Sequence, residues 1–570
     1  RLCYPFTDII DLLINIKSKG RDKHMREEPL FNDDILISIY RHFNFFFTWS
    51  GLIVYAAIVL AVLFLNWLLV RFLFKREKLS LLPDARYAFA DAPAAKWGGV
   101  TALALSFAAY AAATLTQENT LLNNFDLMSV NAIKNMYWGN LPIVDPIRFT
   151  PLSNLDQNLV YAVTRNYAVI DYWIVFKQFI CLFLLYRFFS FIPVVRRLFL
   201  LAVINFLPAV FVVNNMIHTE QLILIFVLLS FMFLDKYAAT QRASYLLWFT
   251  VFANLAVYTK ETAGLFYAGL LGYMILRRVF CGEIGLESFL SPFKTVARMP
   301  AEYMLFWTLF IFLTCYLLLQ DPRVDDAYLQ THHAALPVVV AINKLVLGLN
   351  VLALLLWSVK TLRRKEEKNN LLCEGVLLGC TLVTAVVVFK LQVVVIPDYY
   401  KTYYLYLPAV FCSGYIFSFF RRRLWLWALF SPIVLYAGYV NYNTYMREEG
   451  EERRGVAEFI VSRAENEAVS IYVYSQEMTA HRWWKVTGWA AALKYLYPAG
   501  DIVFKTALRF SDFHVENDMD SYEVRVAPPV PGDYILVHKI NSPSFEPGKN
   551  YVPVYENEVY TIYRTGTQDD

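Results

Sequence analysis

Long apolar runs are the feature that most constrains the fold of this chain. Many of them are near ~20 residues long, about the length that a helix needs to cross the ~30 Å hydrocarbon core of a bilayer. A buried helix of a water-soluble protein explains one such run, but not a series of them. The predicted spans are 51–73, 97–115, 172–189, 198–213, 222–234, 245–258, 263–276, 303–319, 338–359, 371–389, 404–420 and 424–440. We therefore expect an all-α polytopic membrane protein with about 11–12 transmembrane helices.

Composition agrees with this class. The chain of 570 residues is 58% hydrophobic and only 18% charged, whereas a soluble domain has about a quarter charged residues. The seven cysteines show no disulfide or metal-binding spacing. The chain lacks a Walker A motif and a GxSxG motif, so the sequence does not indicate an ATP-driven pump or a serine hydrolase. No nucleic-acid partner is expected.

Positive charge falls at alternate ends of successive spans, in the clusters 71–76, 187–197, 236–242, 277–278, 360–368 and 421–423. The positive-inside rule places these clusters in the cytoplasm. The opposite side then receives the loop after the second span, three shorter connections and everything after residue 441. Residues before the first span would also lie outside. Because an outer N-terminus of this kind is unusual, a segment upstream of Arg1 would explain it.

The region 441–570 differs in character from the apolar runs. A charged helix start at 447–454 is followed by strand patterns at 470–474, 501–505, 523–526 and 534–538, with a helix pattern at 483–496. A closing hairpin is expected at 555–564, centred on Asn557. Strands with an intervening helix predict a small α/β domain, and the orientation places it on the periplasmic or extracellular side.

The long loop between residues 115 and 170 carries an acid and a cation. Asp126 follows the end of a span, and Arg148 precedes Pro151 in the same loop. An acid in such a place is commonly an ordinary interfacial residue. The polar turn 131–135 and the proline-set turn after Arg148 instead favour a catalytic loop.

Two further groups of polar residues stand at the predicted outer ends of spans. Lys260 and Glu261 lie between two apolar runs without a proper loop, and His218 and Glu220 form the tip of a tight hairpin. An interfacial pair that reaches water, or a solvated turn, explains each of them without a function. Charges at membrane depth are nevertheless costly unless they are paired or line a wet cavity, so we expect a cavity. Adjacent residues on a helix diverge by ~100°, so Glu261 does not face Lys260 and Lys260 needs another anionic or polar partner, which a lipid phosphate would supply.

A tyrosine-rich stretch opens the span at 404–420. Its aromatic residues suit a membrane interface, but Lys401 within it could instead bind a phosphate, and Tyr404 follows closely. His332 and His333 lie near two aspartates, but they lack metal-ligand spacing.

Four segments in this order resemble the GT-C class of integral-membrane glycosyltransferases, and most of all its protein O-mannosyltransferase-like family and the bacterial relatives. That family has an acid after its first core span, an Arg-Pro-Leu turn, a Ser-Lys-Glu motif and a late Glu-Arg-Tyr-Leu-Tyr-Leu-Pro stretch. The corresponding residues are Phe125-Asp126-Leu127 with Ala132-Ile133 and Asn135, then Arg148-Phe149-Thr150-Pro151-Leu152, Thr259-Lys260-Glu261 and 401–408. Leu127 replaces a second acid, and Thr402 or Tyr403 replaces the late arginine.

This resemblance implies transfer of a sugar, with inversion, from a polyprenyl-phosphate-linked donor to a glycan or protein acceptor at the outer face of the membrane. Asp126 would be the catalytic base. Lys260, Arg148 and Lys401 would bind the donor phosphate and stabilise its growing charge. The remaining cavity-lining residues would be Glu261, Glu220, His218 and Tyr404. No tightly bound cofactor is expected, and a divalent metal is compatible with the reaction but not indicated.

The resulting division has four parts. Residues 1–50 form an outer N-terminal segment, 51–96 an extra transmembrane helix with a cytoplasmic linker, and 97–440 a GT-C-like core with its catalytic outer loop at 116–171. Residues 441–570 form the outer α/β domain. We expect a bacterial inner membrane, contact with membrane lipid, and a site for an envelope-complex partner on 1–74 or 441–570.

Two other functions stay open at this stage. A flippase or transporter of lipid-linked sugar would use the same basic cavity without a base. A non-catalytic membrane scaffold of an envelope complex would use the C-terminal domain as its binding part. Substitution of Asp126 by Asn separates the three, because only a transferase loses its activity while it still binds the lipid.

Overall fold

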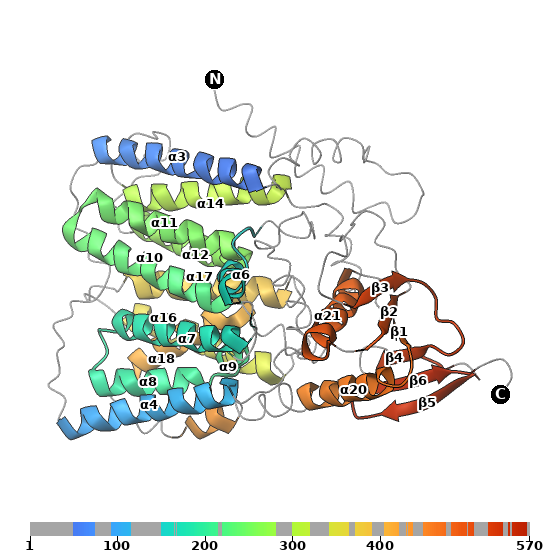
Figure 1. The fold of residues 1–570 in the computed structure, drawn as a ribbon. Helices are drawn as coiled ribbons and strands as arrows, with labels where there is room; N and C mark the ends of the chain where they lie inside the picture. Colours follow the sequence, from blue (N-terminus) through green and yellow to red (C-terminus); the bar gives the residue numbers. More distant parts are fainter. Residues whose placement is uncertain are drawn as a thin grey trace, which may run out of the picture.

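A computed structural model of the protein describes residues 49–73, 93–115, 150–164, 166, 168–214, 219–280, 299–319, 341–363, 371–389, 404–420, 429, 431–436, 449–474, 480–498, 500–506, 522–539, 545–547 and 550–566. These residues form a bundle of apolar helices and a smaller part built on a sheet (Figure 1). The bundle contains α3 (Trp49–Leu73), α4 (Pro93–Leu115), α6 (Leu155–Thr164), α7 (Ala168–Phe188), α8 (Val194–Asn205), α9 (Pro208–Asn214), α10 (Glu220–Thr240), α11 (Ala243–Thr259), α12 (Glu261–Phe280), α14 (Pro300–Leu319), α16 (Ala341–Arg363), α17 (Leu371–Phe389) and α18 (Tyr406–Phe419).

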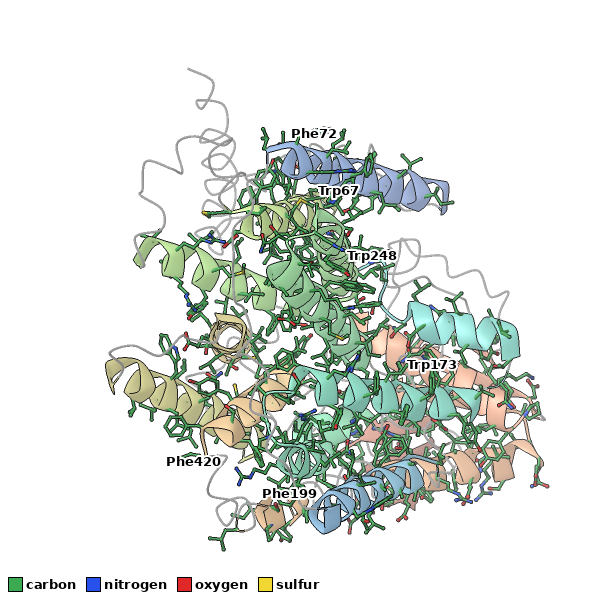
Figure 2. All side chains as sticks on the ribbon, turned by 90° about the vertical axis from the view of Figure 1, so that its left-hand side faces the viewer. Trp67, Phe72, Trp173, Phe199, Trp248 and Phe420 are labelled. Atoms are coloured by element: carbon green, nitrogen blue, oxygen red, sulfur yellow. The ribbon has the colours of Figure 1, made fainter. Side chains whose placement is uncertain are left out.

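Three of the described helices are long and apolar enough to cross a membrane, within Ile53–Leu73, Val169–Phe188 and Glu220–Thr240. Six further apolar segments are shorter. The outer surface of the bundle is correspondingly apolar. Phe72 is 81% exposed on the side of α3 that points away from the bundle, whereas Trp67 points inward and its Nε1 donates to the Ala243 carbonyl at 2.8 Å (Figure 2). Such helices identify an integral membrane protein.

The predicted single span at 198–213 is wrong, because the chain is broken there into α8 and α9. Pro208 has no N–H and its ring disfavours continuous helix across this position. The two residues before it instead form tight turns, in which the Phe206 N–H bonds the Val203 carbonyl and the Leu207 N–H bonds the Ile204 carbonyl. Asn205, at the end of α8, is buried and accepts from Gln178 at 2.7 Å, which fastens the break to α7.

Glycines allow α12 and α17 to approach very closely. A Cβ added at Gly269 would lie 2.6 Å from the Cα of Gly379, and one added at Gly379 would lie 2.5 Å from the Phe266 carbonyl oxygen. Gly375 and Gly379 form a GxxxG motif on α17. Between membrane helices, where no hydrophobic effect drives association, such close backbone contact supplies the van der Waals attraction.

We predict that Gly379→Leu destabilises the protein by about 1–3 kcal/mol, the usual cost of forcing extra volume into a packed contact. The measurement is the midpoint of thermal unfolding in detergent, in single variants. Gly272→Ala on α12, the helix that packs against α17, is the control, because a Cβ there meets nothing within 4 Å. Equal midpoints for the two variants would contradict the close contact.

The C-terminal part confirms the predicted α/β pattern. It contains α20 (Glu449–Ala464), β1 (Val469–Tyr474), α21 (Ala480–Leu496), β2 (Ile502–Thr506), β3 (Glu523–Val526), β4 (Tyr534–His538), β5 (Tyr551–Glu556) and β6 (Tyr560–Thr565). The sheet has the order β3-β2-β1-β4-β6-β5. Strands β3, β2, β1 and β4 are parallel to one another. Strand β6 pairs antiparallel with β4 on one side and with β5 on the other. The hairpin turns at Asn557, whose Oδ1 accepts from the N–H groups of Val559 and Tyr560.

Both helices of this part cover the same face of the sheet. Val456 and Ile460 of α20 and Trp489 of α21 share a buried cluster with Ile471 and Phe504 of the sheet. Arg453 is fully buried, and its Nε donates to the Tyr560 hydroxyl at 2.8 Å. Figure 1 shows α20 and α21 between the sheet and the helical bundle. The helical side of the α/β part, and not its sheet, therefore faces the bundle.

Candidate functional site

The site begins at a one-residue break between two helices. α11 ends at Thr259, α12 begins at Glu261, and Lys260 between them has an extended backbone (φ −165°, ψ 143°). Its N–H still bonds the Ala256 carbonyl, and its own carbonyl accepts from the N–H of Ala263. The predicted absence of a proper loop is therefore confirmed, and the Lys260 side chain is held between two helices.

Lys260 forms an ion pair with Glu220. The Lys260 ammonium contacts the Oε1 atom of Glu220, and the two side chains are 13% and 4% exposed. The ammonium also lies 4.7 Å from the centroid of the Tyr404 ring, within the range of a cation–π contact. Three predicted site residues, from α10, from the α11–α12 break and from the residues before α18, thus come together. Glu261, beside Lys260, is partly buried as the first residue of α12.

The Lys260–Glu220 pair bears on the expectation that Lys260 needs a lipid phosphate as its anionic partner. The adjacent Glu261 cannot face Lys260 on one helix, and from sequence alone Lys260 needed an anionic partner. The structure supplies one within the chain, because Glu220 stands 40 positions earlier on α10. Glu220 lies in the first turn of α10, where Thr219 makes no side-chain capping bond. The partial positive charge of the helix N-terminus favours a carboxylate there.

The turn before α6 reaches the same place. The Leu152 N–H donates to the carbonyl of Tyr258 at 3.1 Å, two residues before Lys260. The turn closes with the Ser153 N–H on the Thr150 carbonyl and with Asn154 at φ 57°. The end of the Arg148–Leu152 motif is therefore fastened to the end of α11.

A second buried ion pair stands nearby and was missed from the sequence. Lys177 of α7 lies 2.7 Å from Asp156 of α6, and both side chains are nearly inaccessible. The Trp173 Nε1 also donates to Asp156 at 2.7 Å. The available signal was a lysine within the predicted span 172–189, because charges inside a membrane span are rare and usually paired.

Polar contacts connect α7 and α10 between the two ion pairs. Gln221, next to Glu220, donates from Nε2 to the Ile174 carbonyl at 3.4 Å, and the Cys181 thiol donates to the Gln221 carbonyl at 3.6 Å. The side chains of Gln221 and Cys181 are both buried. The first turn of α10, which carries Glu220, is thereby fixed against the helix that carries Lys177.

The C-terminal part contacts this end of the bundle. Tyr161 of α6 and Ile170 and Ile174 of α7 form a buried cluster with Ala491 of α21, against which Leu496 also packs. Figure 1 likewise shows α6 on the side of the bundle that faces α21. The α/β part thus lies over the elements that carry the Lys177–Asp156 pair.

Four predicted site residues, Asp126, Arg148, Lys401 and His218, lie outside the described residues. Their predicted roles are unchanged by the structure. Among the residues that the structure describes, no group of three or more His, Cys, Asp or Glu side chains could hold a metal ion.

No protein-family model matches the chain, and no curated protein matches it. Among solved structures, the chain is similar to the arabinosyltransferase EmbB from Mycobacterium smegmatis, determined by cryo-electron microscopy, with a TM-score of 0.40 and 15% sequence identity. The match covers 65% of this chain and 34% of the EmbB chain, so this chain matches about a third of the length of that protein.

We predict that Asp156→Ala destabilises the protein by about 3–5 kcal/mol, because it leaves the ammonium of Lys177 buried without its carboxylate. The measurement is thermal unfolding in detergent. Glu458→Ala is the control, since its pair with Arg454 is exposed and such pairs contribute under about 1 kcal/mol. A small, equal loss in both variants would show that Asp156 does not compensate Lys177.

Proposed function

We propose that the chain is a GT-C-type glycosyltransferase, which transfers a sugar from a polyprenyl-phosphate-linked donor to an acceptor at the outer face of the membrane, with inversion. The observation that carries this proposal is spatial. Three segments of the resemblance meet at one end of the bundle: the turn that ends at Leu152, the Lys260 break and the stretch that begins at Tyr404. A single binding site built from all three segments requires this convergence.

The chemistry of the site suits such a transfer. The acceptor hydroxyl loses a proton as it attacks the anomeric carbon, and Asp126 is proposed to accept that proton. The bond from this carbon to the phosphate oxygen breaks, and the phosphate keeps the electron pair. A cation held nearby stabilises the charge that grows on the phosphate. Lys260 is partly accessible, at 13%, and is proposed to supply this cation together with Arg148 and Lys401.

The family within this class, the sugar and the acceptor are further parts of the proposal. The resemblance favours the O-mannosyltransferase-like family and a glycan or protein acceptor. The α/β part is proposed to stand outside a bacterial inner membrane, over α6 and α7, where an acceptor or an envelope-complex partner can reach it.

We predict that Lys260→Met lowers kcat/KM at least about 100-fold, the usual effect of removing one group that stabilises transition-state charge. The measurement is transfer of a labelled sugar from a panel of polyprenyl-phosphate sugars by protein in nanodiscs. Arg278→Met is the matched control, because Arg278 lies at the other end of α12 in a buried pair with Glu302 at 2.5 Å. Equal loss of activity in both variants would mean that any lost ion pair inactivates the protein.

Asp126→Asn distinguishes the transferase from the other functions. If the chain is a transferase, we expect Asp126→Asn to bind the lipid donor as tightly as the unchanged protein does and to transfer no sugar. A flippase would retain transport of the lipid-linked sugar, and a scaffold would be unaffected. Either of the last two results would refute the transferase.

The outer placement of the α/β part has its own test. Val552 is 58% exposed on the edge strand β5, and the region after residue 441 contains no cysteine. We expect Val552→Cys, made together with Cys3→Ser because Cys3 belongs to the expected outer N-terminal segment, to react with a membrane-impermeant maleimide in intact spheroplasts, whereas Cys3→Ser alone does not. Reaction only after permeabilisation would place the domain in the cytoplasm and invert the topology.

A further inference from the structure

We propose that Glu220 is a specificity-determining residue of the donor site: it disfavours the doubly charged phosphate monoester that the reaction releases, relative to the singly charged phosphodiester of the donor. The inference rests on the proposed function, because it assigns a role to Glu220 within that same site. It follows from the contact of this carboxylate with the only cation that the described residues bring to Tyr404.

Glu220 is placed to act on whatever anion binds Lys260. Its carboxylate contacts the Lys260 ammonium directly, and both groups are largely screened from water by the surrounding helices. An anionic group that reaches the ammonium therefore arrives beside a negative charge at short range. In a site of low polarity this repulsion is much stronger than it would be in water.

The position of Glu220 at the start of a helix suits a negative charge. The residue occupies the first turn of the 21-residue helix α10, whose N-terminal N–H groups favour a negative charge. The adjacent Gln221 fixes this turn against α7. The backbone that carries the Glu220 carboxylate is therefore fixed by contacts that do not involve Lys260.

The two ligands differ in charge by the chemistry of transfer itself. The donor phosphodiester carries one negative charge. When the bond from the anomeric carbon to oxygen breaks, that oxygen keeps the electron pair, the acceptor proton passes to Asp126, and the lipid phosphate becomes a monoester. A phosphate monoester has a second pKa of about 6, so its charge approaches −2 above neutral pH.

A lone cation would hold the product more tightly than the donor, because attraction grows with ligand charge. The Lys260–Glu220 pair is neutral overall, so repulsion from Glu220 grows with the same charge and offsets that preference. Glu220 thereby weakens the bound product more than the bound donor. Its role is to limit inhibition by the product that stays in the membrane.

The test uses two lipid probes, farnesyl phosphate as the monoester and methyl farnesyl phosphate as the diester. Their affinities are measured at pH 8 for the full chain in nanodiscs. For Glu220→Gln we expect the monoester to bind about tenfold more tightly and the diester to gain clearly less. Glu220→Asp, which keeps the charge, should retain the affinity ratio of the unchanged protein. In the transfer assay, Glu220→Gln should lower the inhibition constant of farnesyl phosphate by a similar factor.

Two controls separate this inference from the proposed function. Glu302→Gln removes a buried carboxylate from the Arg278 pair and should leave both affinities unchanged. An equal gain for both probes in Glu220→Gln, or weaker binding of either, would overturn the role of Glu220 while the donor site stands. The donor site at Lys260 requires that at least one probe binds the unchanged protein and that Lys260→Met abolishes this binding. If neither probe meets both conditions, the donor site is elsewhere and both proposals fail.

Discussion

A charge within an apolar bundle requires a partner, and this requirement determines how the helices of the chain are joined. Lys177, Lys260 and Arg278 each find a carboxylate on another helix or helix end: Asp156 of α6, Glu220 of α10 and Glu302 of α14. Hydrophobic burial does not distinguish one apolar helix from another inside a membrane, whereas an ion pair has one correct partner. The three pairs therefore specify neighbours that the apolar surfaces leave undetermined.

The three ion pairs lie in two different parts of the bundle. The Arg278–Glu302 pair joins the C-terminal end of α12 to the first turn of α14. The other two pairs lie where α6, α7 and α10 meet, and α21 of the α/β part packs over α6 and α7. Two of the three pairs thus lie close to the α/β part, whereas α12 and α17 are joined by close Gly269–Gly379 packing.

The sequence predicts the local elements well and the partners poorly. Spans follow from continuous apolar runs, and the strands at 470–474 and 523–526 follow from their patterns, because both signals are local. The break before Pro208 was missed because an apolar run can hide a proline whose backbone effect outweighs composition. The Glu220–Lys260 and Asp156–Lys177 contacts join residues 40 and 21 positions apart. Neither register nor helix orientation can be read from one sequence, so the sequence could not show that Glu220 is the anionic partner of Lys260.

The single-residue connection at Lys260 has a consequence for ligand entropy. The Cα of Lys260 can shift only if α11, α12 or both shift, since its N–H and carbonyl each take part in a helical hydrogen bond. Most surface lysines lose about 0.5–1.5 kcal/mol of side-chain freedom when a ligand immobilises them. Here the backbone is fixed before any ligand arrives, and Glu220 with the Tyr404 ring already restricts the side chain. The ordering has taken place during folding, so a ligand at this ammonium would bind to a prearranged charge rather than to a flexible one.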